Sequence, residues 1–418
     1  NLKFPDLYRV IDIMLDSSFP PWPNFTGEEI EAVSRVLRSN RVNYWTGDEC
    51  RSFENEYAAW TEARHAIAVA NGTVALDLAL HGLKVGSRNG GRADDEVIVT
   101  PRTFIGSVSC VVNAGAVPVF ADVELGTGNI SAATMDAVKT SRTRAAIPVH
   151  LAGHPCDMDP IMQLARSSGF WVIEDCAQAH GAKYKGRSVG SIGDVGAWSF
   201  CQDKILSTGG EGGMVTTNDS GLWERMWSFK DHGKSWDAVY KEVHPPGFRW
   251  VHNSFGTNWR MTEMQAAIGR IQLSRMSEWT RLRGRNAKIL EEAFLPFSGE
   301  SGIVRLPAEI DGHAGSVHAN YKYYVYMRPD RLPEGWCRDR IVDEISKRGV
   351  PCFQGSCSEV YCEKAFEGSG WRPADPLPNA SELSKTSLML LVHPTLTDVD
   401  IRRMAGVVEA VLKDVSGI

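Results

Sequence analysis

The stretch AIAVANGTVALDLALHGL, residues 66–83, joins a short apolar run to a longer amphipathic run through a polar Asn-Gly-Thr turn. The run Ala66–Ala70 is a strand candidate, and the spacing of the apolar residues in Thr73–Leu83 is typical of a helix. A strand followed at once by a helix is the basic unit of an α/β fold.

The same alternation continues along the chain. Further strands are predicted at 96–100, 117–123, 145–150, 170–175, 196–200 and 212–218, and helices at 104–115, 132–140 and 158–167. Alternation at this pace indicates a mostly parallel sheet wrapped by helices. Because the predicted strands are continuous apolar runs, we expect both faces of that sheet to be covered.

Beyond residue 218 the pattern becomes richer in helices. Residues 261–294 are predicted to form one long connecting helix, followed by an aromatic strand at 321–328 and helices near 339–348 and 398–413. We therefore expect a large domain over 46–295 and a smaller C-terminal α/β domain over 296–418. Residues 1–45 form an N-terminal segment with a helix, whose start carries the capping-box pattern of Thr26 and Glu29.

The composition is that of an ordinary globular protein. The 418 residues are 43% hydrophobic and 23% charged, and the net charge of −6 offers no broad basic surface for nucleic acid or anionic lipid. No run approaches the roughly 18 apolar residues of a membrane-spanning helix, and no charged-then-apolar signal precedes the first polar segment. We expect a cytoplasmic protein with neither nucleic-acid nor membrane partners.

The cysteines point to a reducing compartment. There are nine of them, an odd number, and no two are spaced as C-x-x-C. This pattern supports neither a disulfide framework nor a zinc site, so we expect reduced thiols and no metal. The spacing of Cys352, Cys357 and Cys362 matches no usual set of metal ligands.

Several common motifs of nucleotide-binding proteins and hydrolases are incomplete or absent in the sequence. The sequence DHGKS at 231–235 resembles the end of a phosphate-binding P-loop, but Ser228 stands where that loop requires glycine, and no strand leads into it. No G-x-G-x-x-G follows the first strand, and neither H-E-x-x-H nor G-x-S-x-G occurs.

Three polar features remain at predicted strand ends. The helix start at Gly72 and Thr73 offers free backbone N–H groups and a positive dipole end for a phosphate. Asp175 ends a strand, where a buried carboxylate is stable beside a protonated pyridinium nitrogen. Lys204 stands near a glycine cluster and can form a Schiff base. Phosphate, pyridinium and aldehyde are the three groups by which a protein binds pyridoxal phosphate.

Each of these features also has an ordinary explanation. A helix-start Asn-Gly-Thr is often a plain cap, a strand-end aspartate is often a solvated turn residue, and most lysines lie on the surface. Together, in this order and on an α/β scaffold, they favour a cofactor site.

Longer motifs carry a family resemblance. They are NGTVALDLAL (71–80), VTPRTFIGSV (99–108), GAVPVFADV (115–123), IPVHLAGHPCDMD (147–159), VIEDCAQAHGA (172–182), SFCQDKILSTGGEGGMV (199–215) and FGTNWRMTEMQAAIG (255–269). In order and content the chain resembles the DegT/DnrJ/EryC1/StrS sugar aminotransferases. The resemblance implies the aspartate-aminotransferase-like fold (fold type I), with a mostly parallel seven-stranded sheet between helices and a smaller C-terminal α/β domain.

The resemblance also implies roles for individual residues. Lys204 matches the lysine that holds pyridoxal phosphate as an internal aldimine, and Asp175 matches the acid at the pyridinium nitrogen. Gln178 resembles the residue at the ring hydroxyl, and Phe104 the aromatic that stacks on the ring. The phosphate cradle is matched by Gly72, Thr73 and Ser199, and Asn258 matches a residue that reaches the phosphate from the neighbouring subunit. A homodimer with shared active sites follows.

Other positions are left open or depart from the pattern. His180, His150 and His154 are compatible with either a site role or simple packing, and Glu211 is expected to order the glycine turn. Ala152 stands where relatives commonly have an aromatic residue. The segment Lys241–Ser254 is longer and more aromatic than the pattern leads one to expect, and the C-terminal third matches only loosely.

The implied reaction is a ping-pong transfer of an amino group from L-glutamate to a nucleotide-linked keto-deoxysugar. The related sugar 3-dehydratases replace the lysine with histidine, so Lys204 argues against that activity. A carbocyclic keto substrate is an alternative, and so is a non-catalytic regulatory protein that binds the cofactor. The sequence leaves open the nucleotide carrier, and whether the amino group goes to C3 or to C4 of the sugar.

Overall fold

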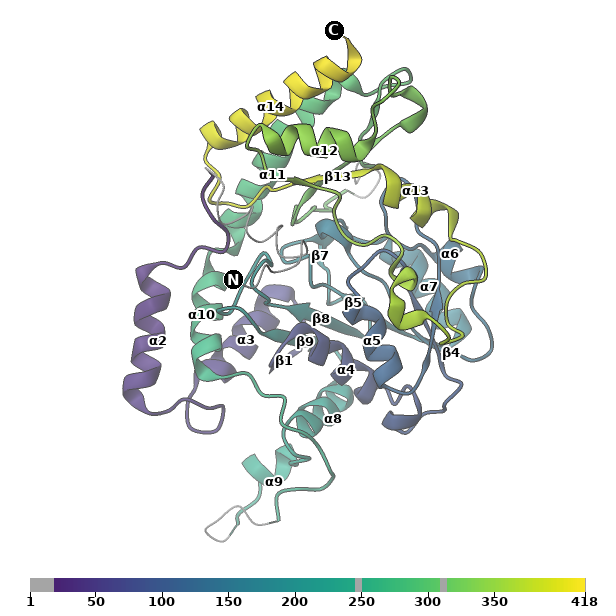
Figure 1. Cartoon of the computed structure of the whole chain (residues 1–418). Coiled ribbons are helices and arrows are strands. Elements are labelled where there is room, and N and C mark those ends of the chain that lie inside the picture. The colour runs from purple at the N-terminus through teal and green to yellow at the C-terminus, as the bar shows by residue number, and fades with distance from the viewer. Residues whose placement is uncertain (1–18, 245–249, 309–313, 418) are drawn as a thin grey trace, which may run out of the picture.

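The computed structural model describes residues 19–244, 250–308 and 314–417, and its centre is a seven-stranded sheet (Figure 1). Its strands are β1 (His65–Val69), β2 (Glu96–Val99), β3 (Val117–Phe120), β4 (Thr143–Ile147), β5 (Trp171–Asp175), β8 (Val195–Ser199) and β9 (Gly213–Thr217). They lie in the order β1-β9-β8-β5-β4-β2-β3, and only β9 runs antiparallel to its two neighbours. The predicted mostly parallel sheet is confirmed.

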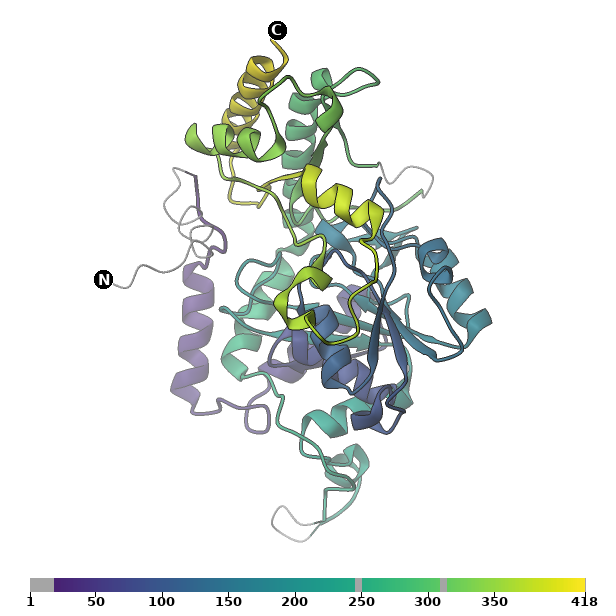
Figure 2. The same ribbon diagram turned by 45° about the vertical axis from the view of Figure 1, so that its right-hand side comes forward.

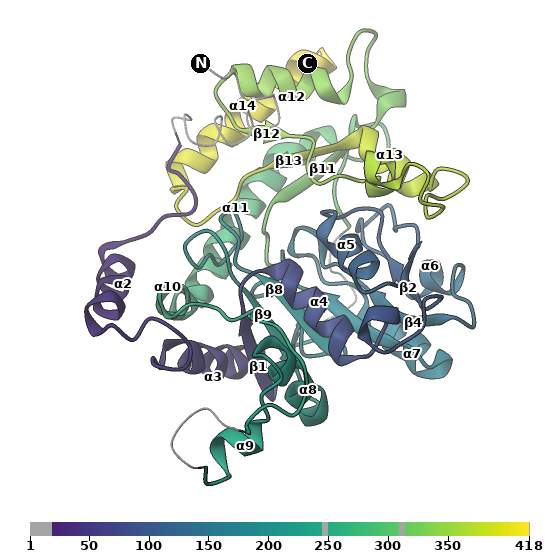
Figure 3. The same ribbon diagram turned by 60° about the horizontal axis from the view of Figure 1, so that its bottom comes forward.

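Helices cover both faces of this sheet (Figures 1 and 3). One face is covered by α4 (Gly72–Gly82), α5 (Gly106–Asn113) and α8 (Ser220–Lys230), and the other by α3 (Glu49–Thr61), α6 (Ala132–Asp136) and α7 (Met158–Ser168). Successive side chains of a strand point to opposite faces. Ile67 and Val69 of β1 accordingly pack with α4, whereas Ala66 and Ala68 pack with α3.

The predicted single helix over 261–294 was wrong. It is two helices, α10 (Glu263–Ser274) and α11 (Met276–Phe294), which meet at Arg275. The Arg275 guanidinium forms ion pairs with Glu28 at 2.6 Å and Glu29 at 2.7 Å. Both acids belong to α2 (Gly27–Ser39), whose predicted capping box between Thr26 and Glu29 is present. The break between α10 and α11 therefore lies at the residue whose ion pairs attach α2 to the rest of the protein.

A second, smaller sheet lies above the large one in Figure 2. It is antiparallel and contains β10 (Val304–Arg305), β11 (Tyr323–Met327), β13 (Ser387–Leu390) and β12 (Cys352–Phe353), in that order. Its core also includes α11, α12 (Arg338–Lys347) and α14 (Asp398–Ser416). Because the end of α11 packs into this core, we propose that the small domain begins near residue 296 and is anchored by that helix.

The remaining elements are short. They are the hairpin β6 (Lys183–Tyr184) and β7 (Arg187–Ser188), the helices α9 (Trp236–Tyr240) and α13 (Pro378–Thr386), and 3-10 turns at Ser87–Asn89, Leu151–Gly153, Leu295–Phe297, Pro329–Arg331, Val360–Cys362 and Lys364–Phe366. The segment that carries α9 projects from the body of the molecule (Figures 1 and 2). Part of the Lys241–Ser254 segment, residues 245–249, and residues 1–18 of the N-terminal segment lie outside the described residues. Within the described ranges, none of the helices combines the length and apolar character needed to cross a bilayer.

Candidate active site

A cavity of about 790 Å³ lies at the carboxyl ends of β1, β5 and β8. Ligands of open parallel sheets bind at this edge because the loops that follow the strands converge there. Seven of the eight site residues predicted from the sequence line the cavity, namely Gly72, Thr73, Phe104, Asp175, Gln178, Ser199 and Lys204. The fold thus brings together residues from separate segments of the chain.

One corner of the cavity is formed by the first turn of α4. The Asn71 side chain caps this helix by accepting a hydrogen bond from the Val74 N–H at 2.9 Å. A Cβ atom added to Gly72 would lie 2.5 Å from Cβ of Ser199, so only glycine fits between them. The corner therefore offers backbone N–H groups, the Ser199 hydroxyl and the positive end of the helix dipole, which suit a phosphate.

Asp175 ends β5 and lies at the cavity with only 5% of its surface exposed. One carboxylate oxygen accepts a hydrogen bond from Ser107 Oγ at 2.7 Å, and the other accepts one from the Ala177 N–H at 3.1 Å. Burial raises the pKa of Asp175, and these hydrogen bonds offset the rise only in part. A cation placed against this carboxylate, such as a protonated ring nitrogen, would stabilise its charged form.

Gln178 and Phe104 form two further walls. Oε1 of Gln178 accepts a hydrogen bond from the Ala152 N–H at 2.8 Å, which leaves the amide nitrogen as a donor for a ligand. Phe104 lies in the loop between β2 and α5 and remains 71% exposed although it lines the cavity. An aromatic face exposed in this way is available to stack on a flat ring.

Lys204 lies in a turn after β8, which its own N–H closes by donating to the Cys201 carbonyl at 3.1 Å. Its Nζ lies 3.8 Å from Oδ1 of Asp203 and 5.1 Å from the ring centroid of Tyr321. The Lys204 carbonyl accepts a hydrogen bond from the Trp22 indole N–H at 2.8 Å. The lysine is therefore fixed through its backbone while its amine faces the cavity.

These residues fit pyridoxal phosphate. The close contact of Gly72 with Ser199 leaves a corner without side-chain bulk for a phosphate. Asp175 provides a buried carboxylate whose pKa is raised by burial, and Lys204 provides an amine in the same cavity. Phosphate, ring nitrogen and aldehyde of the cofactor each have a complementary group.

The model of the DegT/DnrJ/EryC1/StrS aminotransferase family matches residues 23–411. The chain belongs to this family. It is therefore an aminotransferase of fold type I, from a family that depends on pyridoxal phosphate. The family, fold class and enzyme class predicted from the sequence are confirmed.

Known relatives are similar over nearly the whole aminotransferase. An aminotransferase from Psychrobacter cryohalolentis with an X-ray structure is 58% identical, has a TM-score of 0.92, and aligns over 95% of this chain and 99% of its own. A GDP-perosamine synthase of Escherichia coli O157:H7 is 41% identical over 376 residues, 88% of this chain and 95% of its own. A GDP-perosamine synthase of Caulobacter vibrioides is 35% identical over 396 residues, 93% of this chain and 97% of its own.

His180 of the aminotransferase packs beneath the site and does not line the cavity. Its ring lies 5.2 Å from that of Trp198 and 5.7 Å from that of Phe200, centroid to centroid. Burial, and then the positive charges of Lys204 and Arg283, lower the pKa of His180 to about 3. A neutral imidazole between aromatic rings supports the packing alternative.

His150 and His154 also lie outside the lining of the cavity. Nδ1 of His150 accepts a hydrogen bond from the Cys156 N–H at 3.0 Å, so its proton lies on Nε2 and is donated to Glu174 at 3.0 Å. The His154 ring meets that of His318 edge to face at 5.3 Å. The contacts of His150 make it part of a buried network behind β5.

Glu211 lines the cavity, and its backbone organises the glycine turn. Its carbonyl accepts hydrogen bonds from Thr208 Oγ1 at 2.6 Å and from Gln265 Nε2 at 2.8 Å. A Cβ atom added to nearby Gly213 would lie 2.4 Å from the Asn71 carbonyl oxygen. The glycines after Lys204 thus let β9 approach the first turn of α4.

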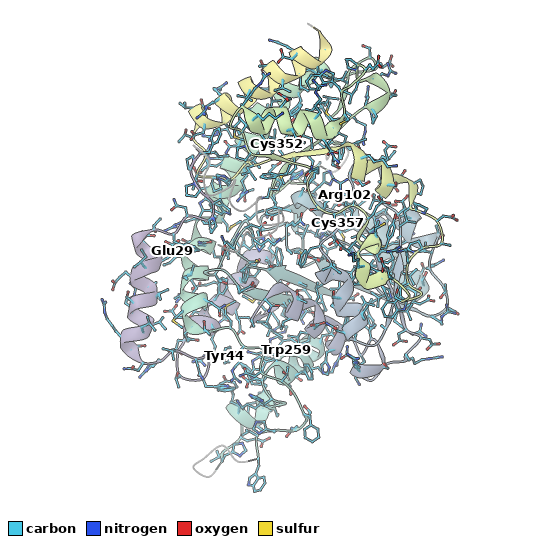
Figure 4. The ribbon with its side chains drawn as sticks, viewed as in Figure 1. Glu29, Tyr44, Arg102, Trp259, Cys352 and Cys357 are labelled. Carbon is cyan, nitrogen blue, oxygen red and sulfur yellow. The ribbon has the colours of Figure 1, made fainter. Side chains whose placement is uncertain are left out.

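Asn258 is the one predicted site residue that does not line the cavity. It forms an isolated antiparallel bridge with Asp231, next to the point where the Ala70 N–H donates to the Trp259 carbonyl at 2.9 Å. Figure 4 shows Trp259 low on the large domain, toward the projecting α9 segment. Asn258 therefore lies near the carboxyl end of β1, beside the segment that leads into Gly72, but outside the residues that line the cavity.

Sequence reasoning missed several residues of the cavity. Ser107 bonds Asp175, and it could have been found because it lies one helical turn after Thr103 and Phe104. Asp203 and Tyr321 flank Lys204, and residues 356–363 close the far side. That loop lies beside the 101–104 loop, since the Val360 N–H donates to the Pro101 carbonyl at 2.9 Å. Figure 4 marks this junction with Arg102 and Cys357.

Proposed function

We propose that this aminotransferase moves an amino group from L-glutamate to the keto group of a nucleotide-linked deoxysugar, with pyridoxal phosphate attached at Lys204. One observation carries the proposal: the amine of Lys204, the buried carboxylate of Asp175 and the helix start at Gly72 line a single cavity. An acid of raised pKa and a nearby amine in a cleft are typical of a catalytic site.

The carrier of the acceptor sugar is proposed to be GDP. Two relatives, at 41% and 35% identity over most of this chain, are named for a GDP-linked product. The wall of the cavity opposite the sheet includes residues of the 356–363 loop, which lies where an acceptor bound beyond the cofactor would contact the protein.

The roles of the residues follow from their positions. When bound, pyridoxal phosphate supplies an electron sink and a carrier for the amino group. With the cofactor bound, Asp175 would hold the proton on the ring nitrogen, and the amide of Gln178 would donate to the ring hydroxyl. Phe104 would cover one ring face and exclude water from it. Lys204, once free, moves a proton between its Nζ and the substrate carbon that carries the amine.

We further propose a homodimer in which Asn258 completes the partner's phosphate site. The support is that three large apolar side chains of the projecting segment, Val243, Trp250 and Phe255, are 99%, 81% and 101% exposed. Several exposed apolar side chains on one segment are typical of a protein–protein contact. The nine cysteines, all free, also fit our proposal of a cytoplasmic enzyme.

The half-reaction tests the enzyme activity. Purified protein loaded with pyridoxal phosphate should convert L-glutamate to one equivalent of 2-oxoglutarate per site. Lys204→Ala should lower this rate by about 1,000-fold or more, because it removes both the attachment point and the proton carrier. Lys183→Ala, which removes an exposed lysine that pairs with Glu62 at 3.1 Å, should leave the rate unchanged. Equal rates in all three proteins would refute the assignment.

A panel of acceptors tests the substrate. The glutamate-treated enzyme is mixed with GDP-, UDP- and dTDP-linked keto-deoxysugars and with a carbocyclic ketone, and aminated products are identified by mass spectrometry. The proposal predicts the fastest turnover with the GDP-linked sugar. Preference for the carbocycle would overturn the substrate class but not the transaminase activity.

Subunit complementation tests the shared site. Lys204→Ala and Asn258→Ala subunits, each inactive alone, are mixed, dissociated and reassembled. A mixed dimer keeps one site with both native residues, so up to about a quarter of wild-type activity should return. If nothing returns although mixed dimers form, Asn258 does not act across the interface.

A further inference from the structure

Lys204 faces a cluster of polar side chains that no sequence motif marks. Oδ1 of Asp203 lies 3.8 Å from its Nζ, and the Tyr321 hydroxyl donates a hydrogen bond to Oδ2 of the same carboxylate. The amine also lies 5.1 Å from the Tyr321 ring centroid, within the range of a cation–π contact. Asp203 and Tyr321, 118 positions apart in the sequence, therefore meet at the reactive amine.

Two further cations are buried around the same carboxylate. Lys322 is 8% exposed, and its Nζ lies 4.7 Å from the Tyr321 ring centroid. Arg283 is 1% exposed and donates to the Tyr321 carbonyl at 3.2 Å. Burial lowers the pKa of Lys322 to about 8, while the nearby charge of Asp203 opposes that fall. Asp203 is thus the carboxylate that balances this group of cations.

The charge of Asp203 itself is well supported. Desolvation opposes ionisation, but Lys204, Lys322 and the hydrogen bond from Tyr321 outweigh it and hold the pKa of Asp203 below its ordinary value. The carboxylate is therefore ionised at neutral pH and attracts the cation beside it. Asp175, the other acid of the cavity, is instead tied to Ser107 and the Ala177 N–H.

We propose that Asp203, held by the Tyr321 hydroxyl, is a positioning residue that fixes the Lys204 ammonium whenever this amine is free, and that Lys322 opposes it. The inference rests on the proposed function, since it concerns the lysine that would carry the cofactor. In such a reaction the lysine is repeatedly released as a free amine, which needs a defined resting place beside the substrate. Asp203 provides that place, and the positive charge of Lys322 repels the ammonium there.

Other titratable groups also lie around the amine. The ionisable groups that line the cavity or interact electrostatically with Lys204 are Asp175, His180, Cys201, Asp203, Glu211, Tyr321, Lys322, Cys357 and Glu363. Among them, Asp203 and Lys322 act on the amine with opposite signs. Replacing each of them should therefore have opposite effects on the amine, which a general loosening of the structure would not cause.

The test measures how readily Lys204 is modified as a function of pH. The full-length chain, freed of cofactor, is treated with trinitrobenzenesulfonate, which modifies only the deprotonated amine, and labelling at Lys204 is quantified by peptide mass spectrometry. Asp203→Asn should move the labelling midpoint down by up to about one pH unit, because an ammonium loses a neighbouring carboxylate that is partly open to solvent. Lys322→Gln should move the midpoint up. Glu363→Gln, which removes another acid of the cavity, should leave the midpoint near that of the wild type.

A second variant separates the effect of the Asp203 carboxylate from that of the Tyr321 hydroxyl that holds it. Tyr321→Phe keeps the ring but removes the hydroxyl that holds Asp203, so its midpoint should move down by less than that of Asp203→Asn. In the double variant the tyrosine change should add nothing, because it acts through the carboxylate. If Asp203→Asn fails to fold, Tyr321→Phe carries the test.

Each result then decides the proposal. Opposite shifts in Asp203→Asn and Lys322→Gln support it, and so does a downward shift in Tyr321→Phe. An unchanged midpoint in folded Asp203→Asn, or shifts of the same sign in both charge variants, would overturn it. Labelling requires neither cofactor nor substrate, so such a failure would leave the aminotransferase assignment standing, whereas failure of that assignment would appear in the half-reaction.

Discussion

The cavity has two walls that are built differently. The sheet wall, with Gly72, Asp175 and Ser199, comes from strand ends, and its polar groups are buried and paired with near neighbours. The facing wall, with Asp203 and Tyr321, is charged, partly open to solvent and assembled from segments far apart in the chain.

The difference in construction indicates that the two walls have different roles, one in the common chemistry and the other in substrate specificity. A rigid sheet edge can hold a cofactor in one fixed orientation, which suits chemistry common to many substrates. The facing wall includes the 356–363 loop of the small domain, and loops on a rigid scaffold usually carry specificity. Damage to the sheet wall should therefore abolish the chemistry, and damage to the facing wall should mainly alter its rate or its substrate.

Within the sheet wall, the largest effect is expected at Asp175. Asp175→Asn keeps the size of the side chain but removes the charge that holds a proton on the cofactor ring. The half-reaction rate should fall by about 100- to 1,000-fold, the size seen when one electrostatic contact to a reacting centre is lost.

Asp194→Asn is the matched control for Asp175→Asn. Burial raises the pKa of Asp194 as well, but its carboxylate accepts a hydrogen bond from the Val172 N–H at 2.8 Å, away from the cavity. Its half-reaction rate should stay within about twofold of the wild type, because surface and structural changes away from a site act mainly on stability. Equal losses in the two variants would mean that the sheet wall has no special electrostatic role.

Gly72→Ala should give the next largest effect. The added Cβ would lie 2.5 Å from Cβ of Ser199, and overpacking of this kind costs about 1–3 kcal/mol. Gly27→Ala is the control, since Gly27 also begins a helix but has no atom within 4 Å of the added Cβ. Thermal unfolding and pyridoxal phosphate titration should show losses in the first variant alone. Normal cofactor affinity in Gly72→Ala would show that the corner at Gly72 does not bind the phosphate of the cofactor.

Trp22→Phe tests the support of the facing wall. It removes the indole N–H that donates to the Lys204 carbonyl at 2.8 Å across 182 positions of sequence. Loss of one such bond should lower the free energy of unfolding by about 1 kcal/mol and slow the half-reaction only a few-fold. Trp171→Phe, at a residue that is 43% exposed at the start of β5, should change neither quantity. A rate loss as large as that of Asp175→Asn would erase the distinction between the walls.

The smallest effect concerns pH and the cofactor-free protein. Folding raises the pKa of Asp175, so the folded state binds a proton more tightly than the unfolded chain. Stability should therefore fall as the pH rises from the ordinary carboxyl pKa of about 3.9 toward the raised pKa of the folded state, by about 1.4 kcal/mol for each pH unit between the two. Urea unfolding of the wild type and Asp175→Asn across this range should show a smaller decline in the variant. If the stability of the wild type and that of Asp175→Asn depended on pH in the same way, burial of the Asp175 carboxylate would carry no free-energy cost in the cofactor-free protein.

Much of the sheet wall could be predicted from the sequence. The alternation of strands and helices locates Gly72, Asp175 and Ser199 at strand ends or helix starts, because local periodicity determines those elements. The sequence contains no comparable signal for the meeting of Asp203 with Tyr321 or of Trp22 with Lys204, since tertiary packing alone brings them together. The break at Arg275 has the same origin, because it depends on ion pairs with α2 that no local pattern contains. The role that we propose for Asn258 requires a second subunit, which the sequence of one chain does not describe.

The most direct test of the central claim is to locate the covalent attachment of the cofactor. Protein loaded with pyridoxal phosphate is reduced with borohydride, digested and sequenced by mass spectrometry. The account predicts one phosphopyridoxyl group per chain, on Lys204 in the peptide that contains SFCQDKILSTGGEGGM (199–214). A label on a different lysine, or none on Lys204 in a protein that binds the cofactor, would contradict it.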